Sequence, residues 1–144
     1  MTSLENRALR QLALKALAQR GGSAADVGAL AAAAECAYDD LARVSAPLIG
    51  HVGVDALTGR ALYLAQRTYP WLVRTREPDQ WKGPFDQIVF CLKRQDPTVA
   101  AEAAGAVLTE LTGLLVTFIG EPLTTHLLRK AWPDAFADAS IEER

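Results

Sequence analysis

The segment between Arg67 and Phe85 carries the residues whose types and spacing most suggest a binding chemistry. It interleaves cationic side chains with large aromatic rings, although Glu77 and Asp79 dilute the charge. Arginine and tryptophan are enriched at the energetic centres of protein interfaces, and aromatics beside arginines can also stack on a base or hold an anionic ligand. We predict a partner-binding loop made of Arg67, Tyr69, Trp71, Arg74, Arg76, Trp81 and Lys82. The alternative interpretation is that Trp71 and Trp81 plug one end of a helical core.

The histidines and cysteines lack the spacing of a metal site or a catalytic site. Neither His51 nor His126 has a second ligand at His-x-x-x-His spacing, and no Gly-x-Ser-x-Gly or phosphate-binding glycine loop is present. The sequence therefore assigns no catalytic residue, no metal ligand and no cofactor, and we expect a protein that is not an enzyme. His51 and Phe118 are instead candidates for lining a ligand pocket between two halves of the fold.

Composition and charge predict a soluble helical protein. Half of the 144 residues are hydrophobic, alanine is abundant, and aromatic residues are few, a mixture that favours helices over sheet. A net charge of -2 provides no global attraction for nucleic acid or an anionic membrane. The longest apolar run, Leu114 to Ile119, is much shorter than the roughly 20 residues of a membrane-spanning helix. We expect a cytoplasmic protein with neither nucleic acid nor membrane as partner, in which Cys36 and Cys91 are buried thiols.

The amino-terminal segment 1–22 is predicted to be an appended amphipathic helix. Thr2 and Glu5 have capping-box spacing, and Gly21-Gly22 ends the pattern. An apolar stripe at helical spacing runs along this segment, and it consists of Leu9, Leu12, Ala13, Ala16 and Leu17. The stripe either packs on the core of its own chain or is exchanged with a second chain in a homodimer.

The rest of the chain resembles itself. Residues 34–65 match residues 101–131 at an offset of 67 when one residue is dropped at the turn, and the match is strongest around Gly53 and Gly120. Each copy is predicted to be a long helix, a sharp corner at its glycine and a short helix. Pro47 predicts a kink or a new start within the first long helix, whereas Asp96-Pro97 predicts the start of the second.

The sequence thus predicts one all-α domain, a compact bundle of about six helices built from two pseudo-symmetric helix-corner-helix units. The expected parts are 1–22, the appended helix; 24–72, the first unit; 73–95, the aromatic and basic loop with a connecting helix; 96–136, the second unit; and 137–144, a tail. The leading functional hypothesis is a non-catalytic regulatory or protein-interaction module, in bacterial signalling, that binds a protein partner through the 67–85 segment or the first helix. The alternative is a sensor domain that binds a small apolar or anionic ligand between the two units.

Overall fold

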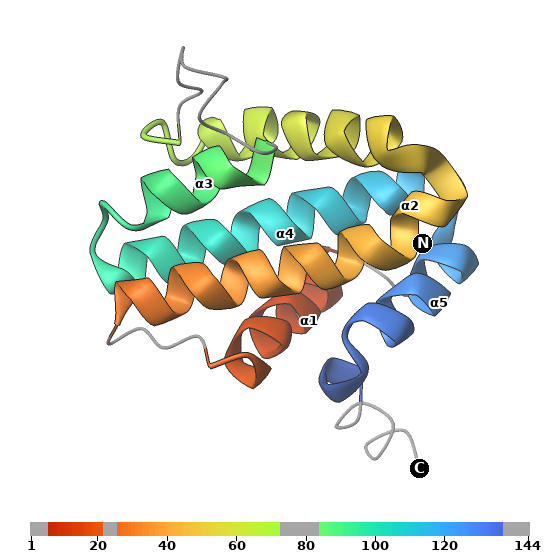
Figure 1. The fold of residues 1–144 in the computed structure, drawn as a ribbon, viewed down its shortest axis with the longest axis horizontal. Helices are drawn as coiled ribbons and strands as arrows, with labels where there is room; N and C mark the ends of the chain where they lie inside the picture. Colours follow the sequence, from red (N-terminus) through yellow and green to blue (C-terminus); the bar gives the residue numbers. More distant parts are fainter. Residues whose placement is uncertain (1–5, 22–25, 73–83, 137–144) are drawn as a thin grey trace.

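A computed structural model describes residues 6–21, 26–72 and 84–136, and every regular element in these ranges is a helix. The elements are α1 (Asn6–Gln19), α2 (Val27–Gln66), α3 (Pro84–Leu92), α4 (Pro97–Ile119) and α5 (Glu121–Ala131), and a short helical segment over 133–136 follows (Figure 1). The predicted all-α bundle is therefore confirmed. The connecting helix expected within 73–95 is α3, and the helix start predicted at Asp96-Pro97 is confirmed as well.

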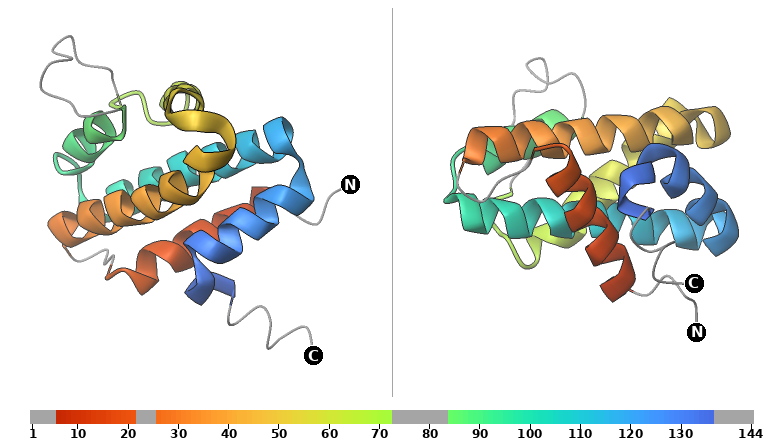
Figure 2. Two further views of the ribbon diagram at one scale, coloured as in Figure 1. Left: turned by 45° about the vertical axis from the view of Figure 1, so that its right-hand side comes forward. Right: turned by 90° about the horizontal axis from the view of Figure 1, so that it is seen from below.

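The two long helices begin in the same way. The carboxylate of Asp26 accepts hydrogen bonds from the backbone N–H groups of Gly28 and Ala29, and that of Asp96 accepts one from Thr98. Such caps satisfy donors that the first helical turn leaves free. Figure 1 and the right-hand view of Figure 2 show that α4 lies beside the first part of α2, which precedes Gly50, and that the two run in the same direction.

The first part of α2, residues 27–49, and α4 also end in the same way, at a glycine with an unusual backbone conformation; the second part of α2 is residues 51–66. Gly50 has φ 82° and ψ 158°, and Gly120 has φ 93° and ψ 159°. This region of backbone space is accessible essentially to glycine alone. The chain bends at both positions, and both bends lie at the same end of the molecule (Figures 1 and 2).

The prediction that Gly53 forms the first corner is wrong, because the helix breaks at Gly50 instead. Gly53 lies inside the second part of α2, and a Cβ added there would lie 3.3 Å from the Cβ of Ile49. The prediction of a kink or a new start at Pro47 is wrong as well. Pro47 leaves one carbonyl of the preceding turn without its helical donor, but Pro47 is exposed, so water can satisfy that carbonyl and the helix continues to Ile49.

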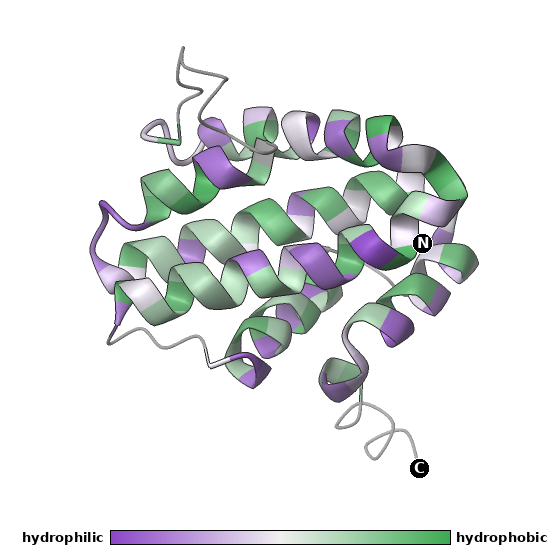
Figure 3. Ribbon diagram, in the orientation of Figure 1, coloured by the Kyte–Doolittle hydropathy of each residue, from purple (hydrophilic) through white to green (hydrophobic). Residues whose placement is uncertain are grey.

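The centre of the bundle is formed by α4, which packs against each of the other four helices. Its surface is largely apolar (Figure 3), and small buried residues such as Ala100, Ala103 and Ala104 let neighbouring backbones approach closely. By length and composition α4 is also the one described helix that could cross a membrane, and 56% of its most apolar stretch is buried inside the bundle. Its central position accounts for this apolar composition. The apolar run from Leu114 to Ile119, the longest in the sequence, is only the last part of α4.

The first helix packs on the core of its own chain. The whole predicted stripe is buried, and α1 lies against α4. A homodimer formed through this stripe would therefore require α1 to leave the bundle.

Trp132, just after α5, is fully buried and donates a hydrogen bond from its indole nitrogen to the carbonyl oxygen of Ala37, 3.1 Å away.

The Arg20 side chain forms hydrogen bonds to residues of three helices. Its guanidinium donates to the carboxylate of Asp40 in α2 at 2.7 and 3.1 Å, to the carbonyl oxygen of Ala131 in α5 at 2.9 Å, and to that of Ala16 in α1 at 3.1 Å. The Arg20 side chain is only 14% exposed, whereas that of Arg43, the other partner of Asp40, is 69% exposed. Two of these bonds satisfy carbonyls in the last turns of α1 and α5, which helices otherwise leave unpaired.

We predict that Arg20→Ala lowers the free energy of unfolding by about 2 kcal/mol, because it leaves partly buried carbonyl and carboxylate groups without donors. Arg43→Ala is the matched control, since it removes an exposed partner of the same carboxylate, and we expect a change within about 0.5 kcal/mol. Urea denaturation measures both. Equal effects of the two substitutions would contradict the role given to Arg20.

The same cluster makes stability depend on pH in a defined direction. Burial raises the pKa of Asp40, but the hydrogen bonds and positive charges of Arg20 and Arg43 outweigh burial and hold the pKa below its ordinary value of 3.8. The folded state therefore binds the proton less tightly than the unfolded chain, so this stabilisation is present above pH 3.8 and is lost as the pH falls through the folded pKa. We predict that Arg20→Ala costs less stability in acid than at pH 7, as measured by urea denaturation at both values. A constant cost would contradict the assignment.

Candidate functional site

The structure describes three of the seven residues predicted for the binding loop. Arg67 is exposed at the end of α2, and Tyr69 and Trp71 follow it, both half-buried, with ring centroids 5.9 Å apart in an edge-to-face arrangement. Tyr69 and Trp71 also pack against the hydrophobic core, so for Trp71 the core-plug interpretation and the binding interpretation both apply. Arg74, Arg76, Trp81 and Lys82 lie outside the described residues.

An open groove joins the two regions that the sequence suggested as binding surfaces. This basic groove has a volume of about 420 Å³ and is lined by residues of α1, of α4 and of the end of α2. Figure 1 shows α4 lying between α1 and the second part of α2. The lining residues are Arg7 and Arg10 from α1, Thr68 and Tyr69 after α2, and Ala106, Thr109 and Glu110 from α4.

The two arginines give this groove its chemistry. Arg7 and Arg10 are three residues apart on one helix, so they lie on the same face. Both are exposed, and neither forms an ion pair with another described residue. Glu110 is the one carboxylate among the described residues of the lining, so these residues together carry a net positive charge. Two guanidinium groups that no described carboxylate occupies, beside an aromatic ring, can bind carboxylates with paired hydrogen bonds.

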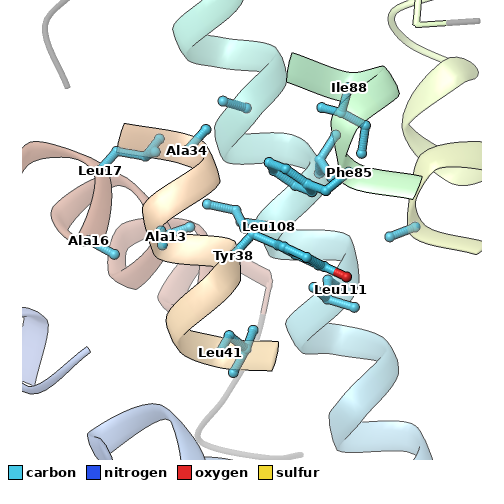
Figure 4. Packing of buried hydrophobic residues seen from close by; sticks show 14 of the residues in the cluster. Ala13, Ala16, Leu17, Ala34, Tyr38, Leu41, Phe85, Ile88, Leu108 and Leu111 are labelled. Carbon is cyan, nitrogen blue, oxygen red and sulfur yellow. The ribbon is translucent and has the colours of Figure 1, made fainter. Parts of the chain in front are cut away.

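A second groove has the opposite charge. This acidic groove has a volume of about 380 Å³ and lies where the two parts of α2 meet α3. Four carboxylates line it, together with His51, two aromatic rings and two small apolar residues; the lining is Glu35, Tyr38, Asp39, Ala42, His51, Val54, Asp55, Phe85 and Asp86. Figure 4 shows the Tyr38 and Phe85 rings against each other, and their centroids are 4.3 Å apart with an angle of 10° between the planes.

Burial and the surrounding carboxylates shift two pKa values in the acidic groove. Burial raises the pKa of Tyr38 above 10.0 despite the opposing hydrogen bond with Thr58, and the charges of Asp55, Asp39 and Asp86 raise it further. Burial also raises the pKa of Asp39 above 3.8, with smaller contributions from Asp40 and Asp86. Burial is the main cause of both shifts, and only the smaller contributions of the neighbouring carboxylates reflect a negative potential, which disfavours a further anion.

The ligand pocket around His51 and Phe118 stays a prediction, and none of the grooves described above is lined by both residues. His51 is exposed at the edge of the acidic groove, whereas Phe118 is 64% exposed near the end of α4 and lines none of the grooves described above. The prediction of two buried thiols is correct for Cys91 and wrong for Cys36, which is exposed. Cys36 shares the outer side of α2 with Glu35 and Asp39, and the small alanines around it hid that orientation in the sequence.

Neither groove was predicted as a unit. Arg7 and Arg10 lie on the polar side of the first helix, and their spacing was the available signal for the basic groove. Among the described residues no three side chains of histidine, cysteine, aspartate or glutamate lie close enough together to hold a metal ion.

No protein-family model matches the sequence, and comparison with curated proteins and with solved structures finds no significant match.

We predict that Asp39→Asn raises the melting temperature at pH 7. The pKa of Asp39 is raised in the folded state, so its ionised form opposes folding above that pKa, and the penalty disappears below the unfolded value of 3.8. The gain in melting temperature should therefore vanish below pH 3.8. Asp134→Asn, which removes an exposed carboxylate after α5, is the control and should leave the melting temperature unchanged. A loss of stability in Asp39→Asn at pH 7 would contradict the charge distribution described here.

Proposed function

We propose that this protein is a non-catalytic interaction module that binds an acidic segment of a partner protein in its basic groove. The observation that carries the proposal is the pair of exposed arginines, Arg7 and Arg10, which form no ion pair within the described ranges and lie across α4 from Tyr69. Arginine and tyrosine are the residue types that most often dominate binding energy at interfaces. We place this activity in the cytoplasm, as the composition suggests, and a regulatory role in bacterial signalling is part of the same hypothesis.

The shape of the groove supports a peptide segment as the ligand. A volume of about 420 Å³ accommodates a few side chains, and the groove is open to solvent. Thr68 and Thr109 add hydroxyl groups, of which that of Thr109 donates to the carbonyl oxygen of Gly105 at 2.6 Å and so has only its acceptor capacity free. An extended segment with two carboxylates could therefore pair with the arginines while its backbone N–H groups approach these hydroxyls.

We also infer that the two bent helices are copies of one ancestral unit, although in a register different from the predicted one. At an offset of 70 without a gap, the capping residue Asp26 aligns with Asp96 and the corner glycine Gly50 aligns with Gly120. The helix between the cap and the glycine is then 23 residues long in both copies. The same offset pairs Leu41 with Leu111, both buried. In the predicted register, Leu48 would pair with Leu115, but the first is exposed and the second buried.

We predict that Arg7→Glu/Arg10→Glu weakens binding of an acidic peptide at least tenfold, because it replaces two attractive charges with two repulsive ones. The probe is a fluorescein-labelled twelve-residue peptide of alternating glutamate and serine, and fluorescence anisotropy at low ionic strength measures the affinity. Raising the salt concentration should weaken the wild-type complex.

Lys93→Glu/Lys130→Glu is the matched control, because it makes the same change in net charge at two exposed lysines outside the groove. It should weaken binding by less than threefold. Equal losses in the two double variants would show that the peptide responds only to overall charge, and this result would overturn the proposed site.

A further inference from the structure

The second part of α2, which runs along the outer edge of the bundle in Figure 1, has apolar residues on two opposite faces. One face packs into the bundle, and its buried residues are Val54, Thr58, Ala61, Leu62 and Ala65. On the opposite face, Val52 and Tyr63 are 84% and 57% exposed, so they are among the most exposed large hydrophobic residues that the structure describes. A surface helix usually presents one apolar face to the core and a polar face to solvent. The outward face of this helix departs from that pattern.

The exposed residues of the outward face form a line along the helix. Val52 and Tyr63 are 11 residues apart, so at 3.6 residues per turn they differ by about 20° in direction and lie roughly 16 Å apart along the axis. Ala56 and Gly59 lie between them, and the four residues have the spacing i, i+4, i+7 and i+11 by which one helix packs on another. Ala56 is exposed, and a Cβ added at Gly59 would meet nothing within 4 Å. We call Val52, Ala56, Gly59 and Tyr63 the outer stripe.

Two arginines flank the outer stripe along one edge. Arg60 and Arg67 are seven residues apart, both are exposed, and neither forms an ion pair with another described residue. The guanidinium carbon of Arg60 lies 5.2 Å from the centroid of the Tyr63 ring, a cation–π contact that holds this charge beside the stripe. Asp55, which lines the acidic groove, lies along the opposite edge. The outward face thus combines an apolar line with a basic edge.

We propose that the outer stripe docks an amphipathic helix of a partner protein, one with an apolar stripe and with carboxylates along one edge. Apolar side chains of that helix would pack on Val52 and Tyr63, and the two backbones would approach most closely over Ala56 and Gly59, where the side chains are small. Charge complementarity specifies the partner, because flanking glutamates or aspartates would pair with Arg60 and Arg67.

A second copy of this chain fits the outer stripe less well than an acidic helix does. Its own outward face has two arginines and one carboxylate, that of Asp55, so two such faces could not neutralise each other. None of the residues of the outer stripe or its basic edge lines the basic groove. The proposed docking surface is therefore separate from the groove and does not depend on the proposed function.

Fluorescence anisotropy of the full chain with two designed helical peptides tests the proposal. Both are fluorescein-labelled, alanine-rich peptides of 18 residues with leucine at four positions spaced i, i+4, i+7 and i+11. The acidic peptide has glutamate at two positions along one edge of the leucines, and the basic peptide has lysine there. We expect the acidic peptide to bind at least tenfold more tightly than the basic peptide, because only its charges complement the two arginines.

Arg60→Glu/Arg67→Glu should reverse this preference, so that the basic peptide binds more tightly than the acidic one. Tyr63→Ala should weaken binding of both peptides at least fivefold, because it removes the largest side chain of the outer stripe. The matched control, Arg7→Glu/Arg10→Glu, makes the same change in net charge in the basic groove and should leave both affinities within threefold of the wild type. All five substituted side chains are exposed, so the variants are expected to fold, and thermal melting by circular dichroism checks this.

Four results would overturn the proposal. Three of them are no binding of the acidic peptide, an unchanged affinity in Tyr63→Ala, and equal losses in the two double variants. Equal losses would show that the peptide responds to overall charge or occupies the basic groove. The fourth is a concentration-dependent dimer of the chain alone that Tyr63→Ala dissociates, as measured by analytical ultracentrifugation, because it would assign the outer stripe to a second copy.

Discussion

The backbone conformation at Gly50 and Gly120 is the constraint on which the rest of the structure depends. Both glycines have φ near +90° with an extended ψ, a region that a side chain makes strongly unfavourable. At Gly50 the bend folds the second part of α2 back, so that Thr58 meets Tyr38 across the corner at 3.0 Å. At Gly120 the bend directs α5 back along the bundle, where the carbonyl of Ala131 reaches Arg20. The acidic groove and the anchoring of the first helix both follow from these two bends.

The bundle also separates its charges, although its net charge is only -2. Carboxylates collect where the two parts of α2 meet α3, whereas Arg7 and Arg10 extend from α1 across α4 from Tyr69. Arg20 differs from these two arginines, because its charge is used inside the bundle to hold α1 against α2 and α5. The proposed partner site uses the basic side of this separation.

The sequence predicts the helices well and the sites poorly, for physical reasons. Local rules define the start of α4 at Asp96-Pro97 and its end at Gly120, because caps and corner glycines act within a few residues. The same rules could not choose between Gly50 and Gly53, since both follow an apolar helix and only packing decides which one bends. The hydrogen bonds of Arg20 reach residues as far away as Ala131, and no local pattern encodes such a distance. Each groove likewise combines residues that are far apart in the sequence, so charge spacing within one helix, such as that of Arg7 and Arg10, was the only signal.

Substitution of single glycines by alanine tests the central claim most directly, with the free energy of unfolding measured by urea denaturation. Gly50→Ala and Gly120→Ala should each lower it by about 1–3 kcal/mol, because alanine is strained in this backbone conformation. Gly59→Ala, in the second part of α2 where a Cβ would meet nothing within 4 Å, should raise it by about 0.5–1 kcal/mol through helix propensity. If Gly50→Ala or Gly120→Ala were as stable as the wild type, the two bends could not be the constraint that shapes this fold.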